Sequence, residues 1–232
     1  MSSLPFSPLP PVHIGTVIVA LALALVNPAC QSPPATSAPP ASPHPTGQGI
    51  REYRDTARLA RTAVEDTIHS LKNLSHPHAR GHGDHPALED FDASLLRLEI
   101  TSLKTRARAE AILARGRDYF EEWHQHLNGL TNAAAAHAGE KRYGRMHDHF
   151  VRIEEASAGV KTAFRPYLDQ LRELRARFDR RPGLAPGATH PQELQEAIQS
   201  GRRVLQALDA VEAALHGAHG ELRAVLSETA AR

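Results

Sequence analysis

Apolar residues recur at a seven-residue period through most of the chain after residue 50, and this periodicity constrains the fold more than any other feature. The most regular run alternates in steps of three and four at Tyr143, Met146, Phe150, Ile153, Ser157, Val160, Phe164, Tyr167, Leu171, Leu174 and Phe178. A second run comprises Phe91, Leu95, Leu98, Ser102, Thr105, Ala109, Ile112, Gly116, Tyr119 and Trp123. Shorter runs lie between residues 53 and 74 and between residues 194 and 225. A period of about 3.5 is typical of helices that pack as left-handed coiled coils. The sequence therefore predicts an all-α fold, an antiparallel bundle of long coiled-coil-like helices.

Proline and glycine separate the periodic segments between residues 76 and 86 and between residues 181 and 191. The alanine run that ends before Gly139 indicates a further turn near residues 138 to 142. We therefore expect helices over about 50–75, 87–138, 141–181 and 191–229. Pro166 falls inside the third of these but outside its apolar seam, so it should bend the helix without disrupting the packing.

The polar residues Ser102, Thr105 and Ser157 occupy seam positions together with Gly116, which predicts a thin and partly polar core. Trp123 continues the seam of the second helix, which favours a core role for its side chain. The alternative hypothesis is an exposed groove beside Phe120 and Trp123 that contributes to a docking surface.

The only cysteine, Cys30, closely follows an apolar run over residues 14–26 and comes directly after Ala29. An apolar export segment that ends in a small residue and cysteine resembles a bacterial lipoprotein signal. This resemblance implies that residues 1–29 are a removed signal peptide and that the Cys30 thiol is acylated. The alternative is a retained membrane anchor, but a helix over the apolar run would be about 20 Å long, short of the ~30 Å hydrocarbon core.

Residues 31–49 are rich in proline, serine and alanine, which favours an extended tether over a helix. At about 3.1 Å per residue the tether could reach about 60 Å from the membrane. The predicted organisation is therefore a signal peptide (1–29), a lipidated Cys30 with its tether (30–49) and a helical bundle domain (50–232). If Cys30 is acylated, the resemblance to bacterial lipoproteins implies the periplasmic face of the outer membrane in the cell envelope, because Gln31 stands where retention in the inner membrane commonly uses aspartate.

Histidine is abundant, with 15 residues in the chain. The first connection contains four of them beside an aspartate, namely His76, His78, His82, Asp84 and His85. Imidazole and carboxylate groups bind zinc, nickel or copper, and a glycine-rich loop could fold around the ion. The alternative is a solvated connector without a metal.

The rest of the sequence carries no pattern of catalytic residues. The net charge of +1 excludes a strong general attraction to nucleic acid. Adjacent glutamates on a helix diverge by about 100°, so pairs such as Glu121 and Glu122 are typical of solvated helix faces and not of a catalytic pair. We therefore expect a protein that is not an enzyme and has no cofactor.

Several segments together resemble a known group of proteins. These are Tyr119-Phe120-Glu121-Glu122-Trp123, Arg142, Tyr143, His149, Ile153-Glu154-Glu155 and Phe164-Arg165-Pro166-Tyr167-Leu168-Asp169. Over about residues 110–180 they are similar to an uncharacterised family of exported bacterial coiled-coil proteins. The resemblance implies a coiled-coil fold and an envelope location, and it assigns no role to any residue.

These observations predict a membrane-tethered envelope lipoprotein that acts as a helical scaffold or interaction module. Its partners would be the membrane, through the lipid, and another protein or a further copy of itself, through the helices. The alternative function is a periplasmic metal-binding or metal-buffering protein that uses the histidine-rich loop over residues 76–85.

Overall fold

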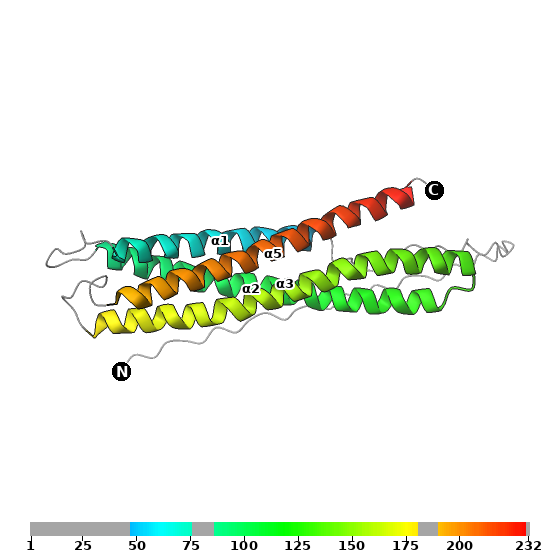
Figure 1. Ribbon diagram of the computed structural model, residues 1–232. Helices are drawn as coiled ribbons and strands as arrows, with labels where there is room; N and C mark the ends of the chain where they lie inside the picture. Colours follow the sequence, from blue (N-terminus) through cyan, green and yellow to red (C-terminus); the bar gives the residue numbers. More distant parts are fainter. Residues whose placement is uncertain (1–46, 76–85, 181–189, 231–232) are drawn as a thin grey trace, which may run out of the picture. The chain divides into compact units, whose positions relative to one another are not determined.

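The computed structural model describes residues 47–75, 86–180 and 190–230, and these ranges are helical apart from short turns. The chain divides into two units, Met1–Pro34 and Ala35–Arg232, and the first lies outside the described residues. The second contains α1 (Gly47–Ser75), α2 (Pro86–Asn128), α3 (Ala133–Asp179) and α5 (Pro191–Ala230). Each helix runs opposite to the one before it (Figure 1). α1 and α3 each pack against both α2 and α5. The predicted all-α antiparallel bundle is confirmed.

The turn between α2 and α3 lies about ten residues earlier than the sequence indicated. We expected the second helix to reach residue 138, but α2 ends at Asn128. Asn132 has an extended backbone, with φ −85° and ψ 110°, and its side chain accepts a hydrogen bond from the Ala135 N–H at 3.1 Å. Asparagine at this position caps a helix N-terminus, so the alanines after it begin α3 and do not end α2. The predicted turn near residues 138 to 142 was therefore wrong.

Pro166 lies within α3 and is exposed, while the seam residues Phe164 and Tyr167 on either side of it are buried. The predicted placement of Pro166 outside the seam is thus confirmed. A proline on the solvent side removes one backbone donor but leaves the apolar face of the helix continuous.

The main core follows the predicted seams of all four helices. Its fully buried members include Val64, Leu71, Leu98, Tyr167, Leu171, Leu194 and Leu215. Polar contacts interrupt this core, as expected: the Tyr53 and Ser157 hydroxyls lie 2.9 Å apart, and Thr105 donates to the Thr56 carbonyl at 3.0 Å. The serine and threonine hydroxyls also bond to helix carbonyls, so the core is thin and partly polar but satisfied at these positions.

A second, aromatic core lies where α2 and α3 continue past the start of α1. A Cβ on Gly49, near that start, would meet Arg115 and Ile112, which places the beginning of α1 beside the middle of α2. Beyond this level the buried residues are Tyr119, Phe120, Trp123, Leu127 and Phe150. We call this group the α2–α3 aromatic cluster. Bulky rings thus fill the part of the α2–α3 hairpin that α1 does not accompany.

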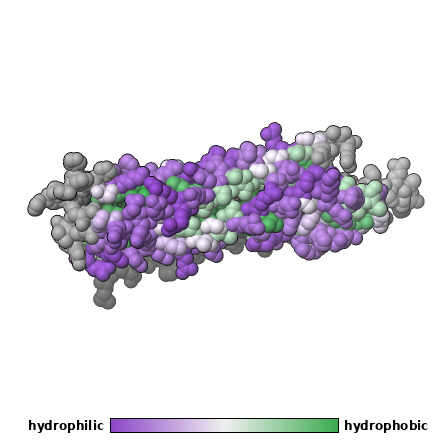
Figure 2. Space-filling view, viewed as in Figure 1, coloured by the Kyte–Doolittle hydropathy of each residue, from purple (hydrophilic) through white to green (hydrophobic). Residues whose placement is uncertain are grey.

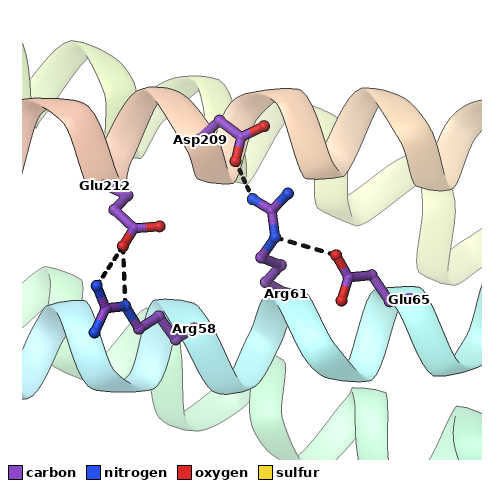
Figure 3. A network of polar contacts seen from close by, with 5 residues as sticks. All are labelled: Arg58, Arg61, Glu65, Asp209 and Glu212. Carbon is purple, nitrogen blue, oxygen red and sulfur yellow. Dashed lines mark hydrogen bonds and ion pairs between the residues drawn. The ribbon is translucent and has the colours of Figure 1, made fainter.

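Ion pairs connect each pair of neighbouring helices. Figure 3 shows Arg58 with Glu212 and Arg61 with Asp209, two pairs that join α1 to α5, and Arg61 also pairs with Glu65 one turn along α1. The Arg58–Glu212 distance is 2.7 Å. Comparable pairs at the other interfaces are Arg108–Glu52, Arg117–Glu154, Arg172–Glu99, Arg145–Glu221 and Arg177–Glu193. Exposed pairs of this kind contribute about 0–1 kcal/mol each. Their placement at each of these interfaces favours one register between the two helices that they join.

Candidate interaction surface

The residues with the most specific predicted chemistry lie outside the described ranges. Cys30 precedes the described part of the chain, and the proposed metal ligands fall between α1 and α2. These ligands are His76, His78, His82, Asp84 and His85. The lipidation site and the metal site therefore stay predictions. Within the described residues there is no group of three or more histidine, cysteine, aspartate or glutamate side chains that could hold a metal ion. Over the same residues, no helix has the length and apolar character needed to cross a membrane.

The α2–α3 aromatic cluster tests the two interpretations of Trp123. Its side chain is 0 % exposed and that of Phe120 only 5 %. The Phe120 ring centroid lies 5.1 Å from that of Phe150 and 5.7 Å from that of Tyr143. Aromatic contacts at these distances add about 0.5–1.5 kcal/mol to what burial alone contributes. The core role of Trp123 is confirmed, and the hypothesis of an exposed docking groove beside Phe120 and Trp123 was wrong.

Histidines cover the aromatic cluster on one side but do not form a chelating group. The His147 ring stacks on Tyr143 with centroids 5.4 Å apart and an interplanar angle of 11°, and His124 lies 5.9 Å from the same ring. Burial, followed by the charge of Glu121, raises the pKa of the Tyr143 phenol. The tyrosine therefore stays neutral at physiological pH, and these contacts are packing interactions.

A groove of about 480 Å³ runs between α3 and α5. It is lined by small residues together with three polar ones, namely Ala156, Ala210, Ala213, Ala214, Gly217, His149, Arg152 and Glu155. Figure 2 shows the corresponding pale, weakly hydrophobic band over the middle of α3 and α5 between hydrophilic flanks. Small side chains at a helix interface leave such a depression, and its lining shows no arrangement specific for a ligand.

The outer face of α2 carries most of the large exposed apolar side chains of the described residues, and Leu59 of α1, 62 % exposed, is a further one. Leu96 is 59 % exposed, Ile100 45 % and Leu103 56 %. The neighbouring positions Ala93 and Ala107 are exposed as well. We call these five residues the α2 outer seam. They are spaced in steps of three and four, as the buried seam of the same helix is. Thus α2 has two coiled-coil-like faces, and the described residues cover only one of them.

Charged residues border the α2 outer seam on both sides. Asp92 and Glu99 lie on the side toward α3, where they pair with Arg175 and Arg172. Arg97 and Lys104 lie on the other side. Arg97 reaches Asp66 of α1 only at 3.9 Å, and Lys104 forms no ion pair within the described part of the chain. Arg106 follows on the same side as Asp92 and Glu99, at the end of the seam, and pairs with Glu110 at 3.7 Å. Over residues 92–104 the apolar stripe lies between an acidic and a basic border, which is the pattern of a helix that pairs with another helix.

Sequence reasoning missed this surface although the signal was present. The steps of three and four at residues 93, 96, 100, 103 and 107 are as regular as those of the buried seam beside them. The buried seam is longer and contains the aromatic residues, so it dominates the periodicity. Only the arrangement of the four helices shows that the shorter seam stays exposed.

Comparison with models of protein families, with curated proteins and with solved structures finds no match to this chain. Any functional conclusion therefore has to come from the residues and their geometry.

Proposed function

We propose that this protein is a membrane-tethered helical scaffold of the bacterial cell envelope, which binds a protein partner through an exposed helix face. The observation that carries the proposal is the α2 outer seam. Three large apolar side chains, each at least 45 % exposed, lie on one face of an already folded helix. Large exposed apolar patches on proteins often mark binding sites, whereas apolar side chains that are exposed singly are common.

The tether in this proposal comes from the sequence. Cys30 follows an apolar run and precedes a proline-rich stretch, an order that suits acylation of Cys30 and an extended spacer. A spacer of this composition would hold the bundle away from the lipid surface. The bundle could then meet partners in the periplasm while it stays attached to the membrane.

The arrangement of polar groups supports a role in binding over one in catalysis. The carboxylates Glu99, Glu154 and Glu212 lie at the surface, where each pairs with an arginine of another helix. The buried hydroxyls of Ser70, Ser94, Thr105 and Ser157 bond to helix carbonyls. Groups held in this way stabilise the bundle.

Acylation of Cys30 is the first test of the proposal. The full chain is expressed in a bacterium with two membranes, together with the Cys30→Ala variant, in cells fed a labelled fatty acid. We expect the label on the parent chain alone, and the parent in the outer-membrane fraction. An unlabelled parent, or a variant that fractionates like the parent, would reject the lipid tether.

Binding through the α2 outer seam is tested separately. A photo-crosslinking amino acid is placed at Leu103 of the full chain and, as the matched control, at Ala176, which is exposed on α3. We expect cross-linked products from position 103 and far fewer from position 176. Equal yields at both positions would contradict a specific interaction surface on α2.

A further inference from the structure

We propose that the partner of the α2 outer seam is a second copy of this chain, bound in parallel so that the two α2 helices form a short coiled coil. This inference rests on the proposed scaffold function, because it names the partner of the same surface. It follows from the side chains in the seam and from the charges along its borders.

The side chains in the α2 outer seam match the preferences of a two-stranded parallel coiled coil. In its heptad frame, Ala93, Ile100 and Ala107 occupy the a positions, while Leu96 and Leu103 occupy the d positions. A β-branched residue at a with leucine at d favours two parallel strands over higher oligomers. Ile100 would then lie beside Ile100 of the second copy, with a leucine layer on each side.

The border charges select the same orientation. Asp92 and Glu99 occupy g positions, and Arg97 and Lys104 occupy the e positions five residues later. In a parallel pair each g residue faces the e residue five positions further along the other helix. Asp92 would thus meet Arg97 of the second copy, and Glu99 would meet Lys104. The twofold axis repeats both pairs, which gives four favourable contacts.

The antiparallel arrangement is disfavoured by the same residues. It places e positions beside e positions and g positions beside g positions, so Arg97 of one copy would face Lys104 of the other and Glu99 would face Glu99. Like charges repel, and these contacts oppose the favourable one that Asp92 would make with Arg106. Charge complementarity therefore argues for the parallel dimer.

These charged groups are available for contacts outside their own chain. Lys104 is exposed and has no ion pair among the residues that the structure describes. Arg172 contacts the Oε1 atom of Glu99, and Arg175 contacts the Oδ1 atom of Asp92. A carboxylate has two oxygens that accept hydrogen bonds, so each can receive a second cation without losing the first.

The proposed contact is short, but its helix is already formed. The bundle holds α2 in place, so dimerisation does not have to supply the free energy of helix formation, which limits isolated short coiled coils. A shared membrane would raise the local concentration of the copies and align their tethered ends.

Disulfide cross-linking of the full chain tests both the contact and its orientation. Cysteine is introduced singly at Ala93, Ile100 or Ala107 in cells, once with Cys30 kept and once with Cys30→Ser. The parallel dimer predicts that each single variant cross-links to its own copy. The control Ala176→Cys and the parent chain should remain uncross-linked. Failure at all three positions, or equal cross-linking of the control, would overturn the proposal.

Orientation is decided by mixing variants. An antiparallel coiled coil places each a residue beside a d residue of the other copy, so residue 107 would lie beside residue 96 and the Ala107→Cys chain would cross-link to a Leu96→Cys chain. It would leave the single variants at 93 and 107 monomeric. The parallel arrangement predicts the reverse pattern, and the antiparallel pattern would reject it.

Substitutions measure how much each contact contributes to self-association. The dimer is measured by analytical sedimentation of the purified full chain. Leu103→Arg should weaken the dimer about a hundredfold, because two leucines leave the contact. Lys104→Glu should weaken it about tenfold, because two pairs become repulsive. The control Lys161→Glu, also exposed, should change nothing. An unchanged dimer in both test variants, with the parent's helix content and melting temperature, would contradict the proposal.

Failure of the dimer and failure of the tether are distinguishable. Cross-links that form in the Cys30→Ser chain show that the seam pairs without the lipid, whatever the acylation experiment finds. A labelled, membrane-bound chain that never cross-links at the seam would overturn the dimer and leave the tethered scaffold with a different partner.

Discussion

Two buried tyrosines show how single residues shape this core. The Tyr53 hydroxyl lies 2.9 Å from the Ser157 hydroxyl, which also donates to the Ile153 carbonyl. The Tyr167 hydroxyl is buried and has no hydrogen-bond partner within the described residues. Burial raises the pKa of both phenols, against a smaller opposite effect of Ser157 on Tyr53. Both phenols are therefore neutral. A hydrogen bond offsets the cost of burying the Tyr53 hydroxyl, whereas nothing described offsets that cost for the Tyr167 hydroxyl.

This difference predicts opposite effects of one substitution. Tyr53→Phe should lower the free energy of unfolding by about 1 kcal/mol, because it removes a buried hydrogen bond. Tyr167→Phe should leave it unchanged or raise it, because a hydroxyl without a partner is deleted. Denaturant unfolding of the parent and the two variants measures both. A Tyr167→Phe protein that loses as much stability as Tyr53→Phe would show that the Tyr167 hydroxyl has a partner.

Glycines in the helices provide a second matched test. A Cβ on Gly116 would overlap the Phe150 ring, whereas a Cβ on Gly159 meets nothing within 4 Å. Gly116→Ala should destabilise the protein by about 1–3 kcal/mol through overpacking. Gly159→Ala should stabilise it by about 0.5–1 kcal/mol, because alanine favours the helix over glycine. Thermal unfolding of both variants is the measurement, and equal shifts of the same sign would contradict the packing described at Gly116.

At the scale of the element, the start of α5 shows how local chemistry defines a helix boundary. Pro191 is its first residue, a position where the missing N–H costs nothing. The Leu194 N–H bonds to the His190 carbonyl at 3.1 Å, and the His190 ring lies 3.4 Å from Glu193 Oε1. Arg177 of α3 reaches the same carboxylate at 2.9 Å. These contacts both begin α5 and attach it to the end of α3.

Glu193 makes the stability of this attachment depend on pH. A hydrogen bond from its own backbone N–H lowers the pKa of Glu193 most, some desolvation opposes this, and His190 and Arg177 lower it further. A lowered pKa means that the ionised carboxylate stabilises the fold above its ordinary pKa of 4.5 and that this contribution is lost as the pH falls through the lowered value. Glu193→Gln should therefore reduce the melting temperature at pH 7.

The effect of Glu193→Gln on the melting temperature should shrink as the pH falls below the ordinary pKa of 4.5. Glu173→Gln is the matched control, since its nearest cation, Arg177, lies 3.8 Å away and its side chain is 72 % exposed. The control should change the melting temperature little at any pH. A difference between Glu193→Gln and the parent that stays constant from pH 7 to pH 3 would contradict the assignment.

At the scale of the described bundle, the two hydrophobic cores have different support. The main core includes residues from all four helices. The α2–α3 aromatic cluster draws its buried members from α2 and α3 only. Regions with fewer packed neighbours open at lower free energy than the rest of a domain. We therefore expect the hairpin beyond the start of α1 to open before the main core does.

Hydrogen exchange of the backbone amides checks this expectation. Amides over residues 117–127 and 135–150 should exchange faster than those over residues 91–112 and 153–178. Trp123→Ala, which removes a fully buried ring at a cost of about 3–5 kcal/mol, should accelerate exchange mainly in the hairpin. The control Leu98→Ala lies in the main core and should accelerate exchange in all four helices. Uniform acceleration by both variants would indicate a single cooperative unit.

Much of this fold follows from the sequence, because heptad periodicity and helix-breaking residues act within a single segment of the chain. The seams of α2 and α3 were predicted residue by residue, since periodicity is a property of one helix and decides which of its faces is apolar. The α2–α3 turn was misplaced by about ten residues because alanine favours helix on either side of a boundary. The side-chain cap at Asn132 is the feature that fixes the start of α3 and so the position of the turn.

The candidate interaction surface was less accessible to sequence reasoning. The predicted groove beside Trp123 is buried, because Phe120 packs against Tyr143 and Phe150 of α3. The surface that is exposed, the α2 outer seam, consists of ordinary apolar residues whose significance depends on the absence of a neighbouring helix among the described residues.

The sequence by itself determined that this chain forms long helices with apolar seams, because a heptad pattern and its proline and glycine breaks act within each segment. Only the tertiary structure decided which of the two seams of α2 lies inside. Either face of that helix could cover apolar surface, and the choice depends on how α1, α3 and α5 pack together. The longer seam, with its aromatic residues, buries more apolar area and takes the inner side, which leaves Leu96, Ile100 and Leu103 exposed.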